Sequence, residues 1–406
     1  MFSATSRFFA SAVRPKTNVV IVGAKRTPIG SFMGGLSTLP APHLGMHAAN
    51  GAMQSIDLPP TEVEEVYMGC VLQAGVGQAP ARQVAYGCEM GDDTPATDVN
   101  KVCASGMKSV MMASQAIQLG HRSVMVAGGM ENMSKTPHYM YLRTPTGFGD
   151  HTALDSIKYD GLTDVYNQIL MGACTEKVCT DMNISREDQD AFAIQSYERA
   201  RAAQEAGIFD WETIEVKMQT RKGEVKISRD EECQKFMPDK FAKLNPAFVK
   251  NGSITAANSS KINDGACAFV MMSEQAAKDR GLKPLARIVA YEDAAVAPIE
   301  FGIAPAKCVD KLLKVAGLQM KDIDYHEINE AFAAVALANM RLGDLDPSIV
   351  NVHGGACAIG HPIGASGSRI ILSLMNVLRT KDATLGMASI CNGGGGASAV
   401  VIERMN

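Results

Sequence analysis

The chain has 406 residues, a formal net charge of −4 and 46% hydrophobic residues. This mixture is typical of a globular protein with enough chain for two or three packed units. The small negative charge excludes a general attraction to nucleic acid, and no apolar run reaches the about 18 residues that suggest a membrane-spanning helix. The ten cysteines form no CxxC pair and no zinc-ligand spacing, so we expect reduced thiols rather than a disulfide framework.

The first segment, residues 1–17, differs in composition from the rest. It contains Arg7, Arg14 and Lys16 among serines and alanines, and the first acidic residue of the chain is Asp57. Arg-rich, Ser-rich and acid-poor N-termini are typical of mitochondrial presequences. The sequence therefore predicts import into the mitochondrial matrix, and the alternative is a basic terminus without a targeting role.

Strand and helix patterns then alternate, which is typical of a sheet with helices on its faces. In the first region the hydrophobic periodicity predicts strands at 18–24, 64–71 and 122–128 and helices at 41–55, 78–90 and 104–120. From about 135 to 262 the pattern loosens into an inserted lobe with one amphipathic helix at 185–206. A second alternating region covers about 284–403.

The two outer regions resemble each other. In each, a turn rich in small residues opens a helical pattern, at KVCASG (101–106) and at CAIGHPIGASG (357–367), and a strand ending in glycine follows. An ancestral duplication would explain this likeness, although two βαβ segments can also look alike by chance.

Cys103 lies where a strand pattern ends and the helical pattern from about Ala104 begins. The positive end of a helix and its unpaired N–H groups favour the thiolate, the reactive form of cysteine. The sequence therefore makes Cys103 a candidate nucleophile, and the alternative is a small residue that fills a tight turn.

Three further residues lie in comparable surroundings. Pro362 and nearby glycines would hold the His361 imidazole in one orientation, as a general base requires, although His361 could instead cap a helix. Cys391 precedes four glycines whose N–H groups could bind an oxyanion, and the Lys-Ser/Thr of a Walker phosphate loop is missing. The Asn329 amide could donate a hydrogen bond, but by itself it favours a helix N-cap. Two cysteines and a histidine in glycine-rich turns suggest carbanion chemistry beside a thioester rather than hydrolysis.

Four motifs, VCASGMKS, NEAFA, GHPIGASG and CNGGGG, closely resemble those of the thiolase family and occur in its order. The likeness extends from about Val19 to the C-terminus, and DGLTDVYN (160–167) and ASICNGGGGAS resemble the mitochondrial acetoacetyl-CoA branch. The resemblance implies an α/β thiolase fold, with two similar βαβαβαββ halves in a five-layer αβαβα sandwich plus a loop domain. The corresponding segments would be an N-terminal half at 18–134 with 263–283, a loop domain at 135–262 that covers CoA, and a C-terminal half at 284–406.

The resemblance also implies roles for the candidate residues. Cys103 would take the acyl group, His361 would activate it, and Cys391 would move a proton at carbon 2 of the second acyl-CoA. Asn329, through a water, and His361 would form one oxyanion site, and the N–H groups of Cys103 and Gly393 the other. A homotetramer would then join two acetyl-CoA reversibly into acetoacetyl-CoA and CoA by a ping-pong route, without a cofactor for the chemistry.

The same resemblance assigns ligand contacts. The positions that match residues near CoA or its acyl group are Tyr197, Lys235, Lys240, Ser260 and Phe301. Members of this branch are activated by potassium, and the matching positions are Tyr197 and the carbonyls of Ala256, Ala257, Ser259 and Cys357.

Two positions depart from the family pattern. Leu170 stands where the family usually has an active-site histidine, and Gly302 follows Phe301 where this branch often has a proline. The missing proline would leave room for a 2-methyl group, which predicts cleavage of 2-methylacetoacetyl-CoA. The alternatives are a longer-chain 3-ketoacyl-CoA thiolase of fatty-acid β-oxidation and, in another class, a non-catalytic acyl-CoA-binding relative.

Overall fold

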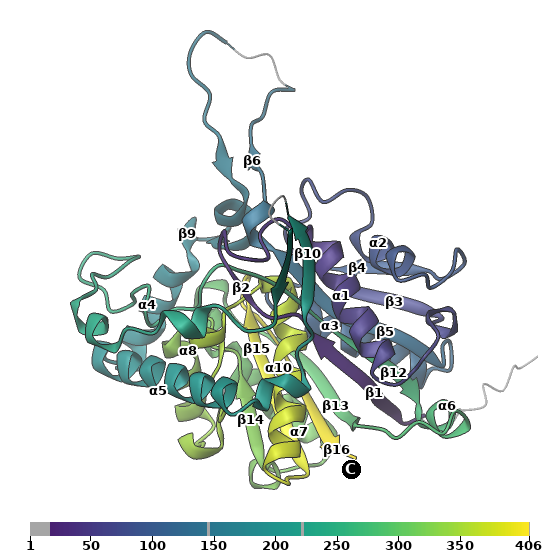
Figure 1. The fold of residues 1–406 in the computed structure, drawn as a ribbon. Helices are drawn as coiled ribbons and strands as arrows, with labels where there is room; N and C mark the ends of the chain where they lie inside the picture. Colours follow the sequence, from purple (N-terminus) through teal and green to yellow (C-terminus); the bar gives the residue numbers. More distant parts are fainter. Residues whose placement is uncertain (1–16, 144–146, 221–222, 406) are drawn as a thin grey trace, which may run out of the picture.

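The structure, a computed structural model, describes residues 17–143, 147–220 and 223–405 (Figure 1). Residues 1–16 of the predicted presequence lie outside the described residues. The main feature is a ten-stranded sheet in the order β14-β15-β16-β13-β1-β12-β5-β3-β4, with β2 beside β12. Its strands are β1 (Val19–Arg26), β2 (Gly30–Ser31), β3 (Glu65–Gly69), β4 (Ala96–Val99), β5 (Val124–Asn132), β12 (Asn263–Ser273), β13 (Ala286–Ala295), β14 (Tyr325–Ile328), β15 (Leu385–Asn392) and β16 (Gly396–Arg404).

The sheet consists of two halves that meet where β1 pairs with β13, over the three residue pairs from Val19–Ile288 to Ile21–Ala286. The first half runs β1-α1-β3-α2-β4-α3-β5-β12, and the second runs β13-α7-β14-α8-α10-β15-β16. An isolated bridge between His326 and Val350 stands where the second half would have its third strand. The prediction of two βαβαβαββ halves is therefore confirmed, with one strand of the second half reduced to a bridge.

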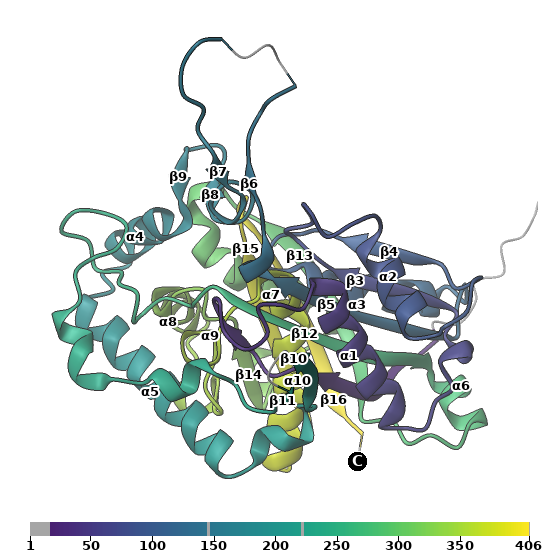
Figure 2. The same cartoon turned by 45° about the horizontal axis from the view of Figure 1, so that its top comes forward.

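Helices cover the outer faces of the sheet and fill the space between its halves (Figures 1 and 2). On the outside, α1 and α2 pack on the first half and α7 on the second, whereas α3 and α10 pack on each other and on both halves. Strand β1 shows why: Val20 and Val22 join the outer cluster, and Val19 and Ile21 join the middle one, as expected from the two-residue period of a strand. The α-helices are α1 (Ala41–Gln54), α2 (Pro80–Gly87), α3 (Ser105–Gln118), α4 (Met171–Asp181), α5 (Arg186–Glu205), α6 (Glu274–Asp279), α7 (Ala304–Ala316), α8 (Ala333–Leu342), α9 (Ala356–Ile359) and α10 (Ile363–Thr380).

The segment between β5 and β12 forms a lobe beside α8 and α9. It carries α4, α5 and three hairpins, β6 (His138–Tyr139) with β7 (Leu154–Asp155), β8 (Thr163–Asp164) with β9 (Ile169–Leu170), and β10 (Val216–Thr220) with β11 (Gly223–Ile227). Arg26 at the end of β1 ties this lobe to the sheet, because its fully buried guanidinium pairs with Glu212 and Asp230, each at 2.7 Å. Among the described residues, no helix has the length and apolar character to cross a membrane.

Candidate active site

Cys103 sits in a sharp turn between β4 and α3. Val102, just before it, has a φ of 48°, a value that a β-branched residue rarely adopts. Ser105 holds this turn, since its Oγ accepts from Lys101 N at 2.8 Å and donates to Val102 O at 2.6 Å. Backbone strain of this kind is characteristic of functional sites. The turn leaves Cys103 partly exposed, whereas the other nine cysteines are buried.

Two predicted groups of the glycine-rich strand end, Gly393 and Cys391, lie near Cys103. Burial raises the pKa of the Cys103 thiol to about 11, and hydrogen bonds from the N–H groups of Gly393 and of Cys103 itself act in the opposite direction. Burial, followed by the nearby Cys103, also raises the pKa of the Cys391 thiol. The two thiols therefore lie within electrostatic reach of each other. The N–H groups favour the thiolate, as expected from the sequence, but desolvation acts more strongly in the opposite direction.

His361 is held in one orientation, as its sequence context predicts. Its Nδ1 lies 2.6 Å from Ser366 Oγ, and its backbone N–H donates to Asn263 Oδ1 at 2.9 Å. The preceding Gly360 has a φ of 114°, and a Cβ there would lie 2.5 Å from the Asn263 side chain, so only glycine fits. The imidazole does not cap α10, whose N-cap is Pro362.

The other ring nitrogen of His361 is available for chemistry. Its Nε2 is buried and has no partner among the residues that the structure describes. Burial, followed by the Arg369 charge, lowers the pKa of the His361 imidazole to about 3, so the ring is neutral at pH 7. A neutral imidazole held in one orientation has the lone pair and the geometry that a general base requires, while the burial that lowers its pKa weakens it as a base in this state.

Asn329 follows β14 and is buried, yet both polar atoms of its amide lack a partner in the described part of the chain. It is not a helix cap, because α8 begins at Ala333 with Phe332 as its N-cap. Buried amides without partners are rare and costly. An unsatisfied amide is what a site for a water or a substrate oxygen would require.

Close backbone packing holds α3 and α10 together near the two turns. A Cβ on Gly129 of β5 would lie 2.1 Å from Gly364 O, and one on Gly106 would lie 2.8 Å from Ser368 Oγ. Buried Glu131 adds a polar tie, accepting from Gly364 N and Val71 N, each at 3.0 Å. The turn of Cys103 and the segment of His361 are thereby fixed relative to each other.

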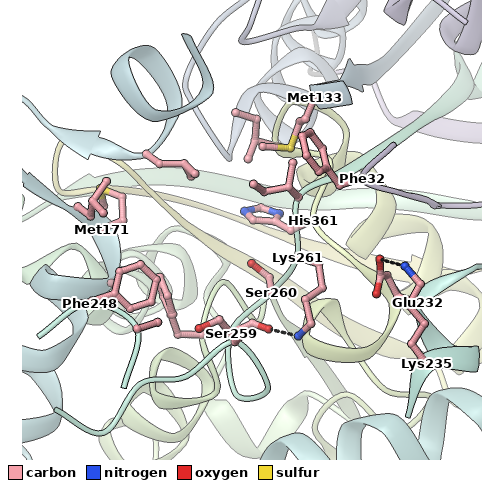
Figure 3. A pocket seen from close by; sticks show the side chains of 18 residues that line it. Phe32, Met133, Met171, Glu232, Lys235, Phe248, Ser259, Ser260, Lys261 and His361 are labelled. Carbon is pink, nitrogen blue, oxygen red and sulfur yellow. Dashed lines mark hydrogen bonds and ion pairs between the residues drawn. The ribbon is translucent and has the colours of Figure 1, made fainter. Parts of the chain in front are cut away.

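A cavity of about 500 Å³ opens beside His361 (Figure 3). The predicted CoA-contacting residues Ser260 and Lys235 line it, and so does Leu170. Its apolar wall is formed by Phe32, Met133, Met171, Phe248, Phe332 and Ile363. A mostly apolar cavity with a few polar groups is the usual form of a small-molecule site.

Three predicted ligand contacts lie elsewhere. Tyr197 is buried in an aromatic cluster, stacked on Phe236 with ring centroids 5.0 Å apart. Phe301 is buried in the apolar cluster that contains Cys391, and Lys240 is exposed. None of the three lines the cavity.

Comparison with known proteins decides the family. The chain matches the model of the thiolase N-terminal domain over residues 19–275 and that of the thiolase C-terminal domain over residues 282–404. The chain belongs to the thiolase family. This thiolase is 53% identical over 396 residues to the mitochondrial acetyl-CoA acetyltransferase of Danio rerio, which covers 97% of this chain and 94% of the relative. The corresponding Bos taurus protein is 52% identical over 395 residues, covering 97% and 93%.

Solved thiolase structures share the fold. A thiolase of Ascaris suum in complex with coenzyme A is 42% identical, with a TM-score of 0.91 over 95% of this chain and 100% of that one. Human mitochondrial 3-ketoacyl-CoA thiolase is 39% identical, with a TM-score of 0.92 over 96% and 99%.

The two departures from the family pattern have different surroundings in this thiolase. Leu170 lines the cavity, so an apolar side chain stands where the family usually has a histidine. A Cβ on Gly302 would face Val178 and Val335, at 3.3 and 3.4 Å, and Gly302 does not line the cavity. The structure therefore gives no direct support for extra acyl room at Gly302.

Two of the predicted potassium ligands, the carbonyls of Ser259 and Cys357, accept from a side chain of the thiolase itself. The Nζ of Lys261 donates to Ser259 O at 2.6 Å and to Cys357 O at 3.4 Å. A potassium ion on these carbonyls would lie beside a like charge, so the residues present do not fit the ion.

Sequence reasoning missed four residues that organise this site: Ser366, Asn263, Glu131 and Lys261. Ser366 lies inside the motif GHPIGASG, and Asn263 and Lys261 lie inside SSKINDG, both visible in the sequence. The hydrogen-bond partners of these residues, however, depend on how the chain folds in three dimensions, and hydrophobic periodicity does not predict that.

Proposed function

We propose that this thiolase is an acetyl-CoA C-acetyltransferase, which joins two acetyl-CoA into acetoacetyl-CoA and CoA and also runs in reverse. The observation that carries the proposal is that the turn of Cys103 lies against the glycine-rich end of the strand that carries Cys391: a Cβ on Gly393 would lie 3.5 Å from Val102, and the Gly393 N–H is directed at the Cys103 thiol. Two thiols at one place supply both a nucleophile and a proton carrier, and simple hydrolysis needs only the first. The names of the relatives at 52–53% identity support the short-chain substrate.

In the cleavage direction, the Cys103 proton moves to His361 Nε2 as the sulfur attacks the 3-keto carbon of acetoacetyl-CoA. The bond between carbons 2 and 3 breaks, and carbon 2 takes the proton of Cys391, so acetyl-CoA leaves. The raised pKa of Cys391 suits this step because it keeps the thiol protonated. Incoming CoA then gives its proton to Cys391 and attacks the acetylated Cys103, whose sulfur recovers the proton from His361.

Charge that develops on the substrate oxygens needs donors. The N–H groups of Cys103 and Gly393, which already point at the thiol, would bind one oxyanion. Asn329, through a water, and the protonated His361 would bind the other. The unpartnered amide of Asn329 supports this role.

CoA would enter through the cavity beside His361, against Ser260 and Lys235. The Ascaris suum thiolase in complex with coenzyme A supports this ligand. We assign the lobe at 135–262 to cover CoA, and the N-terminal half at 18–134 with 263–283 and the C-terminal half at 284–406 to carry the chemistry. Residues outside the cavity would contact other parts of CoA or act through their neighbours; these are Tyr197, Lys240 and Phe301.

The assembly would be a homotetramer in the mitochondrial matrix. Residues 140–143 and 147–153 project from the body and expose Met140, Tyr141, Leu142 and Phe148, and exposed apolar side chains of this kind suggest a protein interface (Figure 1). The mitochondrial relatives and the composition of residues 1–17 support import. Light scattering of the purified protein and the location of a reporter fused to residues 1–17 test these two points.

The function is tested with acetoacetyl-CoA and CoA, following the loss of the 3-ketothioester absorbance in wild type and in Cys103→Ala. We expect rapid loss in the wild type alone. Longer 3-ketoacyl-CoA substrates cleaved faster than acetoacetyl-CoA would favour the β-oxidation alternative, and 2-methylacetoacetyl-CoA tests the branched substrate. No cleavage by a folded wild type would favour the non-catalytic acyl-CoA-binding alternative.

A further inference from the structure

A lysine contacts part of the predicted potassium site. Lys261 lines the cavity beside Ser260, and its Nζ donates to the carbonyl oxygen of Ser259 (Figure 3). The same Nζ donates to the carbonyl oxygen of Cys357. The same ammonium lies 5.7 Å from the ring centroid of Tyr197, within the range of a cation–π contact. Three of the five positions expected to bind potassium therefore contact the charge of Lys261.

Two carboxyl groups offset part of the cost of burying this charge. Burial lowers the pKa of Lys261, the Glu232 and Glu330 carboxyl groups act in the opposite direction, and Lys235 adds to the lowering. Both acids are buried, and Glu330 also accepts from Cys357 N at 3.0 Å. A weakly hydrated cation and an ammonium group both carry positive charge and accept no hydrogen bond. Backbone carbonyls and nearby carboxyl groups can therefore bind either one.

We propose that the Lys261 ammonium replaces a monovalent cation, so that this thiolase needs no potassium. It joins the wall of the cavity at 255–261 to helix α9, which carries Cys357 and precedes His361. The consequence for the enzyme rests on the CoA cavity of the proposed function. The Lys261 ammonium is covalently attached to the chain and cannot dissociate as a bound ion does. The wall of the cavity would therefore be ordered at any potassium concentration.

The test compares potassium with sodium at equal ionic strength, using the melting temperature and the Kd for CoA from calorimetry. Wild type should show the same two values in both salts. Lys261→Ala removes the charge and opens space, so in sodium it should bind CoA about tenfold more weakly and melt earlier. Potassium should restore both values saturably.

Two further variants keep the result interpretable. Lys261→Met retains the apolar stem without the charge and should lose CoA affinity with no recovery in potassium. Lys314→Ala, at an exposed position of α7, should match wild type in both salts. A saturable effect of potassium on wild type would overturn the proposal, and this remains decisive if Lys261→Ala does not fold.

A Lys261→Ala protein that loses CoA affinity without recovery in potassium would also overturn it, since Lys261 would then act on CoA directly. Neither readout depends on turnover. Absence of thiolysis would therefore count against the proposed function, and a potassium response against the inference about Lys261.

Discussion

The Nδ1 atom of His361 lies 2.6 Å from the Oγ of Ser366, and that hydroxyl donates its single proton to Pro362 O at 2.9 Å. In that arrangement Ser366 accepts from Nδ1–H, which leaves Nε2 without a proton. The hydrogen bond of one ring nitrogen thus sets the chemistry of the other.

Replacing Ser366 with alanine should remove this control of the tautomer while leaving the imidazole in place. We expect kcat/KM for thiolysis to fall by about 10- to 100-fold, less than the loss of about 10²–10⁴-fold that removal of a general base can cause. Ser366→Thr should keep most of the activity because the hydroxyl remains. Equal activity of Ser366→Ala and wild type would show that Nδ1 needs no partner.

Cys103 and Cys391 should be needed in different half-reactions. Exchange of labelled CoA into acetyl-CoA needs only Cys103 and His361, whereas cleavage of acetoacetyl-CoA also needs a proton on carbon 2. Cys391→Ala should therefore keep exchange within about tenfold of wild type and lose cleavage by about 10²–10⁴-fold. Cys308→Ala, a buried cysteine of α7, is the matched control and should retain both. Loss of exchange in a folded Cys391→Ala protein would place Cys391 in the acylation step instead.

Asn329 and Asn351 should respond in opposite ways to alanine. Asn351 is buried with its amide satisfied, donating to Glu330 Oε1 and accepting from Ile328 N, each at 2.8 Å, so its loss should cost about 1–3 kcal/mol of unfolding free energy. The amide of Asn329 has no partner within residues 17–143, 147–220 and 223–405, so Asn329→Ala should change stability little. It should nevertheless lower kcat by about 10²–10³-fold, as for an oxyanion donor.

Thermal unfolding and steady-state kinetics of both variants check this contrast. If Asn329→Ala is fully active, or melts as early as Asn351→Ala, the oxyanion role is wrong.

Alkylation of Cys103 should report its protonation state. With a thiol pKa of about 11, the thiolate fraction increases about tenfold for each pH unit between 7 and 10. The rate of reaction with iodoacetamide, followed by intact mass, should rise accordingly without a plateau below pH 9. Cys103→Ala should stay largely unmodified because the other nine cysteines are buried. A plateau below pH 8 would show that the thiolate forms an ion pair with His361.

Local hydrophobic periodicity was sufficient to predict the helices that bury one face. The predicted helices at 41–55, 104–120 and 185–206 correspond to α1, α3 and α5 within two residues at each end. Helix α4, by contrast, was missed because it lies in a stretch without a strong periodic signal and packs on α8 and the lobe. The motifs around Cys103, His361 and Cys391 were also visible, because tight turns demand small residues wherever they occur.

Packing in three dimensions established the rest. The high pKa of Cys103, against the expected thiolate, follows from burial that no neighbouring residue in the sequence reveals. The replacement of potassium by Lys261 depends on carbonyls from residues 259 and 357, which are almost 100 positions apart along the chain. Composition and periodicity act over a few residues and can specify turns and elements. Desolvation and convergent hydrogen bonds depend on every segment that folds onto a site, and they decide its protonation and its ligands.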